Sequence, residues 1–127
     1  MEYDWTGKTI LIAEDELINF RLLQLMLAKT NVTILHGRDG LKTFQLFNEN
    51  PQINLVLMDI KMPEMDGCEV TREIRKVRSD LPIIAQTAYA LSGDREIAME
   101  AGSNDYISKP IMKVKLHELV QKYFMNS

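Results

Sequence analysis

A regular alternation between short apolar runs and longer amphipathic stretches is the strongest constraint on the fold. Five runs have the length and residue types of buried strands. They span Thr9 to Ala13, Val32 to Leu35, Ile53 to Met58, Leu81 to Ala85 and Asp105 to Ile107. The third run is the most apolar, which predicts a central strand. We expect residues 1–127 to form a single domain with a polar lead of residues 1–7.

The amphipathic stretches have the apolar spacing of helices. They are expected at Glu16 to Ala28, at Leu41 to Asn48, from Asp66 or Gly67 onward, at Leu91 to Ala101, and around a first turn that contains Pro110. The apolar spacing rests on Ile18, Leu22, Leu25 and Met26 in the first helix, Val70, Ile74 and Val77 in the third, and Leu116, Leu119, Val120 and Tyr123 in the last. Gly102 is expected to cap the fourth helix. Alternation of this kind predicts an α/β fold, in which helices cover both faces of a parallel sheet.

Composition argues against several classes of function. A net charge of −3 gives no sign of a nucleic-acid surface. No apolar run approaches the ~20 residues that span a bilayer, and Glu2 and Asp4 make the N-terminus unlike a signal peptide. Cys68 is the single cysteine and cannot form an internal disulfide, which suits the reducing cytoplasm.

Polar residues follow four of the five predicted strands, at the edge where parallel sheets bind ligands. They are Glu14 and Asp15 after the first strand, Asp59 after the third, Gln86 and Thr87 after the fourth, and Ser108 and Lys109 after the fifth. Each has an ordinary structural explanation, such as a helix cap or an acidic first turn. Their joint placement at four strand ends favours a common site instead.

The chemistry of this set favours a metal and a phosphoryl group. The carboxylates of Glu14, Asp15 and Asp59 would repel one another, and Mg²⁺ would relieve that repulsion. The Thr87 hydroxyl and the Lys109 ammonium could hold phosphoryl oxygens. Asp59, in the middle of the set, is placed to attack phosphorus and form an acyl phosphate.

Four motifs extend this interpretation to nearly the whole chain. They are ILIAEDE (Ile10 to Glu16), LVLMDIKMPEMDG (Leu55 to Gly67), IIAQTAYA (Ile83 to Ala90) and DYISKP (Asp105 to Pro110). In this order they resemble the response-regulator receiver domain of two-component systems, in the form found in hybrid sensor histidine kinases. The resemblance implies a doubly wound, flavodoxin-like sheet of five parallel strands in the order 2-1-3-4-5.

The resemblance also implies a role for each site residue. Asp59 matches the phosphoacceptor. Mg²⁺ would be held by Asp15 and Asp59 directly, by Glu14 through water, and by the backbone carbonyl of Lys61. Thr87 matches the switch hydroxyl, Lys109 the lysine that pairs with phosphoryl oxygens, and Tyr106 the aromatic switch.

A receiver of this kind is a signalling protein that catalyses its own phosphorylation and dephosphorylation. The implied partner is a sensor histidine kinase or a histidine phosphotransfer domain, docked on the first helix near Asn19 and Phe20. The implied output surface comprises the fourth helix, fifth strand and fifth helix, which could also form a homodimer. No contact of this domain with nucleic acid or membrane is expected.

Two rival functions each require a feature that this chain lacks. An Asp-nucleophile phosphatase of the haloacid dehalogenase type needs a second Asp two residues after the nucleophile, where this chain has Lys61. A flavodoxin-like mononucleotide binder needs a phosphate-binding loop after the first strand, where Glu14 and Asp15 would repel phosphate.

Overall fold

The computed structural model describes residues 3–88 and 93–125, and their strands form one parallel sheet in the predicted order β2-β1-β3-β4-β5. The strands are β1 (Thr9–Ala13), β2 (Thr33–Gly37), β3 (Leu55–Asp59), β4 (Ile83–Thr87) and β5 (Asp105–Ser108). The α-helices are α1 (Leu17–Leu27), α2 (Gly40–Glu49), α3 (Gly67–Val77), α4 (Asp94–Ala101) and α5 (Lys113–Met125), and a short 3₁₀ turn follows α1. The predicted doubly wound sheet is therefore confirmed.

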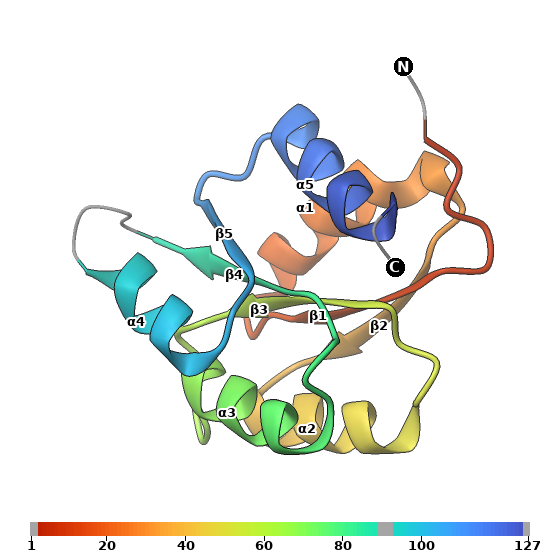
Figure 1. Ribbon diagram of the computed structural model, residues 1–127. Coiled ribbons are helices and arrows are strands. Elements are labelled where there is room, and N and C mark those ends of the chain that lie inside the picture. Colours follow the sequence, from red (N-terminus) through yellow and green to blue (C-terminus); the bar gives the residue numbers. More distant parts are fainter. Residues whose placement is uncertain (1–2, 89–92, 126–127) are drawn as a thin grey trace.

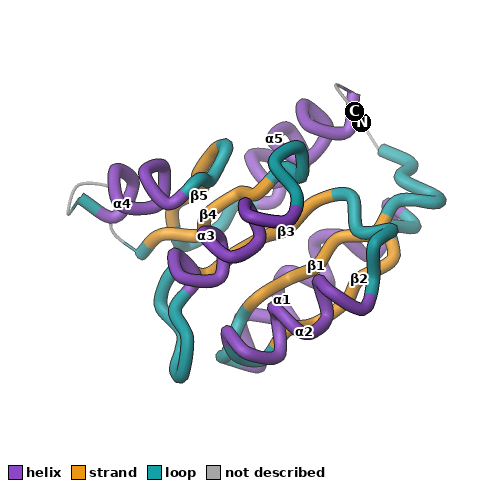
Figure 2. The backbone as a smooth tube through the Cα atoms, turned by 60° about the horizontal axis from the view of Figure 1, so that its bottom comes forward, coloured by secondary structure: helices purple, strands orange, loops and turns teal. Residues whose placement is uncertain are grey.

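Helices cover both faces of the sheet (Figures 1 and 2), with α1 and α5 on one side and α2, α3 and α4 on the other. Alternate strand residues supply the two cores. Ile10 and Ile12 of β1 belong to the cluster under α1 and α5, whereas Leu11 and Ala13 belong to the cluster under α2 and α3. By the same alternation, the side chains of Glu14 and Asp59 lie on the face of the sheet that α1 and α5 cover. Their carboxylates are therefore on the same side of the sheet.

Several helix ends follow from single residues. The Asp39 side chain accepts a hydrogen bond from the Lys42 amide at 2.7 Å, and Asp66 accepts one from the Glu69 amide at 2.9 Å, so both cap helix N-termini. Gly102 has φ +119° and caps α4 as predicted. The predicted start of α4 at Leu91 lies outside the described residues.

The inward face of α1 differs from the prediction. Ile18, Leu22 and Leu25 are 77%, 50% and 72% exposed, whereas Phe20, Leu23 and Leu27 are buried. The segment LINFRLLQLML carries apolar residues around most of its circumference, so spacing alone does not select a face. The choice is made by packing, since the Phe20 ring stacks on His36 of β2 with centroids 3.6 Å apart. An apolar row on α1 is left exposed.

Two smaller expectations about helix faces are also wrong. Val77, at the last turn of α3, is 64% exposed because the helix ends there and the chain turns toward β4. In α5 the last core position is filled by Phe124, while Tyr123 is half-buried and its hydroxyl donates to an oxygen of Asp105 at 3.0 Å.

Pro110 does not lie in the first turn of α5. The Lys109 amide still donates to the Thr87 carbonyl at 2.7 Å, so the chain leaves the sheet only after Lys109. Residues 110–112 then make the turn, and the helix begins at Lys113. This late start keeps Lys109 beside the carboxyl ends of the strands.

The N-terminal lead is attached to the domain. Trp5 is 4% exposed and its indole N–H donates to Gln121 Oε1 of α5 at 2.7 Å. Its backbone amide donates to the Thr30 carbonyl at 2.7 Å. Among the residues described, no helix has the length and apolar character to cross a membrane.

Candidate functional site at the carboxyl end of the sheet

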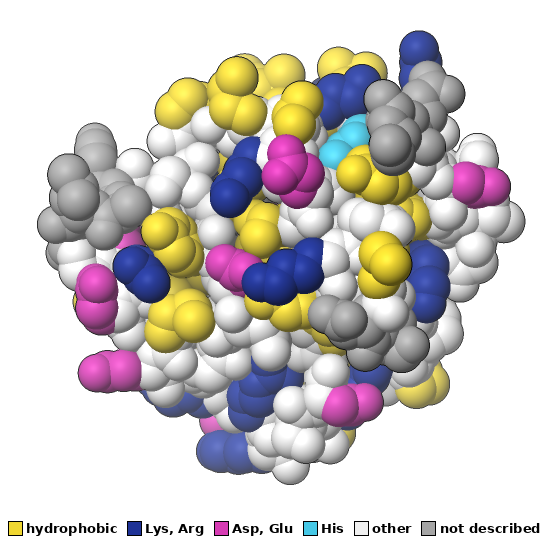
Figure 3. Space-filling model, turned by 45° about the horizontal axis from the view of Figure 1, so that its top comes forward, with side chains coloured by type: hydrophobic (Ala, Val, Ile, Leu, Met, Phe, Trp, Pro, Cys, Tyr) yellow, Lys and Arg dark blue, Asp and Glu magenta, His cyan; other side chains and the backbone are white. Residues whose placement is uncertain are grey.

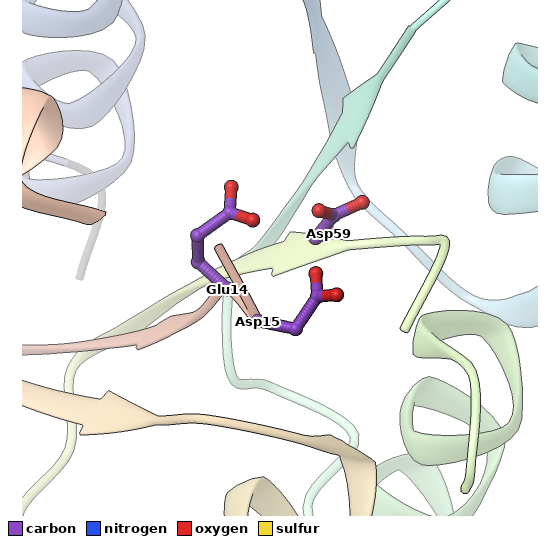
Figure 4. Close-up of side chains that lie close together, drawn as sticks. All are labelled: Glu14, Asp15 and Asp59. Atoms are coloured by element: carbon purple, nitrogen blue, oxygen red, sulfur yellow. The ribbon is translucent and has the colours of Figure 1, made fainter. Parts of the chain in front are cut away.

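Three carboxylates meet where β1 and β3 end. Figure 4 shows the side chains of Glu14 and Asp15, just after β1, around the same space as Asp59, the last residue of β3. One oxygen of each lies within 4.8 Å of an oxygen of the other two. Glu14 and Asp59 are buried, while Asp15 is exposed. The predicted acidic cluster is therefore formed.

Asp59 is held by one hydrogen bond to each carboxylate oxygen. The Lys61 amide donates to Oδ1 and the Lys109 ammonium donates to Oδ2, both at 3.0 Å. The loop after Asp59 needs a glycine at Gly67, because a Cβ there would collide with the Asp59 carbonyl oxygen. The close approach of Gly67 closes the loop onto the end of β3 and fixes the direction of Asp59.

Burial and charge act together on Glu14 and Lys109. Burial raises the pKa of Glu14 to about 7, and the neighbouring Asp59 charge adds to this, while Lys109 opposes it from 3.4 Å. Burial lowers the pKa of Lys109, but Asp59 and Glu14 outweigh that effect and leave it raised. Lys109 therefore stays charged, and its ammonium pairs with the carboxyl groups of Glu14 and Asp59.

The residues present fit a hard divalent cation. Within the described part of the chain, Glu14 Oε1 is buried and has no hydrogen-bond partner. Burial and the Asp59 charge both oppose the ionisation of its carboxyl group. A cation with oxygen ligands would relieve both, and carboxylate oxygens are the ligands that Mg²⁺ prefers.

Thr87 lies on β4, the neighbour of β3, and Tyr106 lies on β5, one strand further out. Thr87 ends β4, is fully buried, and its Oγ1 has no partner among the described residues. Tyr106 of β5 is half-buried against the small cluster of α3 and α4 residues. The guanidinium carbon of Arg95 lies 5.0 Å from the centre of its ring. The structure brings Glu14, Asp15, Asp59 and Lys109 together, with Thr87 and Tyr106 flanking them.

Sequence reasoning missed two supporting residues. Gln86 was placed at a strand end without a role, although a polar residue in an apolar strand is itself a signal. It is 1% exposed and pairs in register with Asp59. His36 was also given no role. Its Nε2 lies 2.8 Å from the Glu14 carbonyl oxygen, which fixes the backbone beside the acidic cluster.

Comparison with known proteins identifies the class. Residues 10–121 match the family model of the response regulator receiver domain. The match covers most of the chain, and the chain therefore belongs to this family, the receiver domains of two-component systems.

The most similar relatives include two kinds of signalling protein. The chain is 35% identical over 119 residues to hybrid signal transduction histidine kinase I of Dictyostelium discoideum; the match covers 87% of this chain and 7% of that protein. It is 34% identical over 118 residues to the polar-differentiation response regulator DivK of Brucella ovis, covering 91% of this chain and 95% of that one.

Two solved structures are informative about the site and its partners. One is the receiver domain of sensor histidine kinase PA1611 from Pseudomonas aeruginosa, with a magnesium ion coordinated in its active-site cleft. It has a TM-score of 0.86 and 36% identity, and the match covers 93% of this chain and 98% of that one. The other is the receiver domain of Ssk1 from Saccharomyces cerevisiae in complex with the histidine phosphotransfer protein Ypd1. It has a TM-score of 0.80 and 27% identity, and the match covers 93% of this chain and 87% of that one.

Proposed function

We propose that Asp59 accepts a phosphoryl group from a phosphohistidine of a partner protein, in a Mg²⁺-dependent reaction. The observation that carries this proposal is the setting of the Asp59 carboxylate, which accepts a hydrogen bond from the Lys109 ammonium and clusters with the carboxyl groups of Glu14 and Asp15. In the transfer, an Asp59 oxygen forms a bond to phosphorus and the phosphorus–nitrogen bond breaks. The imidazole keeps the electron pair and takes a proton from water. Hydrolysis of the acyl phosphate then returns Asp59 to a carboxylate.

Mg²⁺ would be held by the side chains of Asp15 and Asp59 and by the backbone carbonyl of Lys61, with Glu14 acting through water. When bound, it supplies positive charge to the oxygens of the transferred group. The magnesium-containing relative of 36% identity supports this choice of metal. Lys109 lies 3.0 Å from Asp59 Oδ2 and supplies a second positive charge at the same place.

Thr87 and Tyr106 are the residues proposed to report the new charge. The Thr87 hydroxyl is buried without a partner among the described residues, and a phosphoryl oxygen on the neighbouring strand would give it one. Movement of Thr87 toward that oxygen would open space for Tyr106, which packs on the α4 side. The signalling surface would then be formed by α4, β5 and α5.

The proposed partner, a sensor histidine kinase or a histidine phosphotransfer domain, would dock on α1. Ile18, Leu22 and Leu25 form an exposed apolar row there, and Met112 and Val114 are exposed at the start of α5. Figure 3 shows hydrophobic side chains gathered along its upper edge, on the side of the molecule that carries α1 and α5. Phe20, near which docking was expected, is itself buried, so the exposed apolar side chains around it would make the contact. The Ypd1 complex of the yeast relative supports this class of partner.

Phosphorylation is tested by incubating the protein with acetyl phosphate or phosphoramidate and Mg²⁺ and measuring the intact mass. One phosphoryl adduct is expected in the parent and none in Asp59→Asn. Asp80→Asn is the matched control, since Asp80 has an 81% exposed side chain and precedes β4 at the opposite end of the sheet. The proposal fails if no donor gives an adduct, or if Asp59→Asn is modified as readily as the parent.

A further inference from the structure

The side-chain amide of Gln86 is buried near the end of β4. This residue is the second-last of β4, between Asp59 of β3 and Ile107 of β5 in the register of the sheet. Gln86 is 1% exposed, and neither its Nε2 nor its Oε1 has a hydrogen-bond partner in the described part of the chain. Burial of an amide without partners is unfavourable. Leucine or isoleucine would fill the same position in the core without this penalty, so the amide needs a physical reason.

Gln86 lines a cavity that adjoins the acidic cluster, because Glu14 belongs to both. The cavity has a volume of about 130 Å³ and lies between α1 and the chain that leaves β5. Most of its exposed wall is apolar, and this part is built by Leu22, Leu23, Met26, Pro110 and Ile111. An apolar cavity of about 150 Å³ in another protein holds benzene. The volume here therefore suits an apolar group about the size of one aromatic ring.

Besides the neutral Asn19, the cavity wall contains two charged residues that restrict the charge of an occupant. Glu14 and Lys109 both line the cavity and lie 3.4 Å apart, and Lys109 also pairs with Asp59 at 3.0 Å. An anion in the cavity would compete with these carboxylates for Lys109, and a cation would compete with Lys109 for Glu14. A neutral head leaves the pairs intact.

We propose that this cavity is a binding site for a small neutral molecule with a ring-sized apolar body and a primary carboxamide head. The head would pair reciprocally with Gln86: its N–H donates to Gln86 Oε1, and its carbonyl accepts from Gln86 Nε2. The apolar body would lie against Leu22, Met26 and Ile111. This inference does not rest on the phosphoryl-transfer proposal, since it requires neither Mg²⁺ nor modification of Asp59.

The test is a titration of the ¹⁵N-labelled protein with benzamide, followed by amide chemical shifts. Acetophenone is the matched probe, because it has the same shape and carbonyl but no N–H donor. Benzamide should give saturable shifts in residues 19–26 and at Lys109 and Ile111. Acetophenone should bind about tenfold more weakly, the ratio expected for the loss of one hydrogen bond.

Two variants decide whether Gln86 is responsible. Gln86→Leu should bind the two probes equally, and Gln86→Asn, which keeps the amide on a shorter stem, should retain part of the preference for benzamide. Thermal unfolding of each variant checks that it is folded. The proposal is overturned if benzamide gives no saturable shifts up to its solubility limit. That result is expected if water alone fills the cavity. It is also overturned if Gln86→Leu keeps the parent's preference for benzamide.

Discussion

Substitution Glu14→Gln should stabilise the metal-free protein above about pH 7. The pKa of Glu14 is about 7, against an ordinary value of 4.5, and each tenfold difference in proton affinity corresponds to about 1.4 kcal/mol. The ionised carboxylate therefore lowers the free energy of unfolding by about 3 kcal/mol once the pH exceeds both values. Glutamine removes this charge, and the pKa already includes the opposing attraction to Lys109 at 3.4 Å. We expect a net gain of about 2–3 kcal/mol.

The sign of the pH dependence follows from proton binding. Between pH 4.5 and about 7 the folded state holds the Glu14 proton and the unfolded state has lost it. The stability of the parent should therefore fall as pH rises through this window. Gln cannot titrate, so the advantage of Glu14→Gln should be present above about pH 7 and disappear below about pH 4.5.

Urea unfolding with a metal chelator, at several pH values, measures this difference. Glu16→Gln is the matched control, because Glu16 is exposed and two residues away. Saturating Mg²⁺ should reverse the order of stability, since it binds the folded parent more tightly than the variant. The electrostatic argument would be refuted if Glu14→Gln were less stable than the parent at about pH 8 without metal, or if its advantage did not change with pH.

Two further predictions concern the scaffold. Arg75→Met should lower the free energy of unfolding, measured in urea, by about 2–3 kcal/mol. The reason is that the Arg75 guanidinium donates to three backbone carbonyls and one side-chain amide, and these bonds join α3, α4 and β4. Arg72 is exposed on the same helix, so the control Arg72→Met should have little effect. Trp5→Ala should lower the free energy of unfolding by about 3–5 kcal/mol, because Trp5 is 4% exposed and its indole is hydrogen-bonded to Gln121. Unfolding monitored by circular dichroism measures this loss. An unchanged unfolding midpoint would show that the N-terminal lead is not part of the core.

Element type could be predicted from the sequence more reliably than element faces. Thr9–Ala13 was located in full, because a buried parallel strand is a continuous apolar run. The fourth strand extends past the apolar residues to Thr87, since its end is set by pairing with β3 and β5 rather than by polarity. For α1 the spacing indicated Ile18 and Leu22, whereas the sheet buries Phe20. Apolar residues around the whole helix leave that choice to tertiary packing.

The sequence predicted which residues form the site better than it predicted their burial and pKa values. Parallel topology places the ends of β1, β3, β4 and β5 at one edge, so the residues that follow each strand could be named in advance. Whether a carboxylate is buried depends on the side chains around it. Glu14 and Asp15 are adjacent in sequence, yet one is fully buried and the other exposed. That difference sets the pKa of Glu14 and cannot be obtained from spacing.

The unsatisfied polar groups of this protein are concentrated where it is proposed to act. Among the described residues, buried side-chain atoms without partners belong to Glu14, Gln86, Thr87 and Asp94. The first three lie at the carboxyl ends of β1 and β4, and Asp94 begins α4. Native proteins leave few such groups, and a group left without partners in the unliganded state gains a hydrogen bond or a metal contact when a ligand arrives. A cation would satisfy Glu14 and a phosphoryl oxygen Thr87. Gln86 lies beside Asp59 in the register of the sheet, but it also lines the largely apolar cavity at α1. A second, neutral ligand in that cavity is therefore our explanation of its burial.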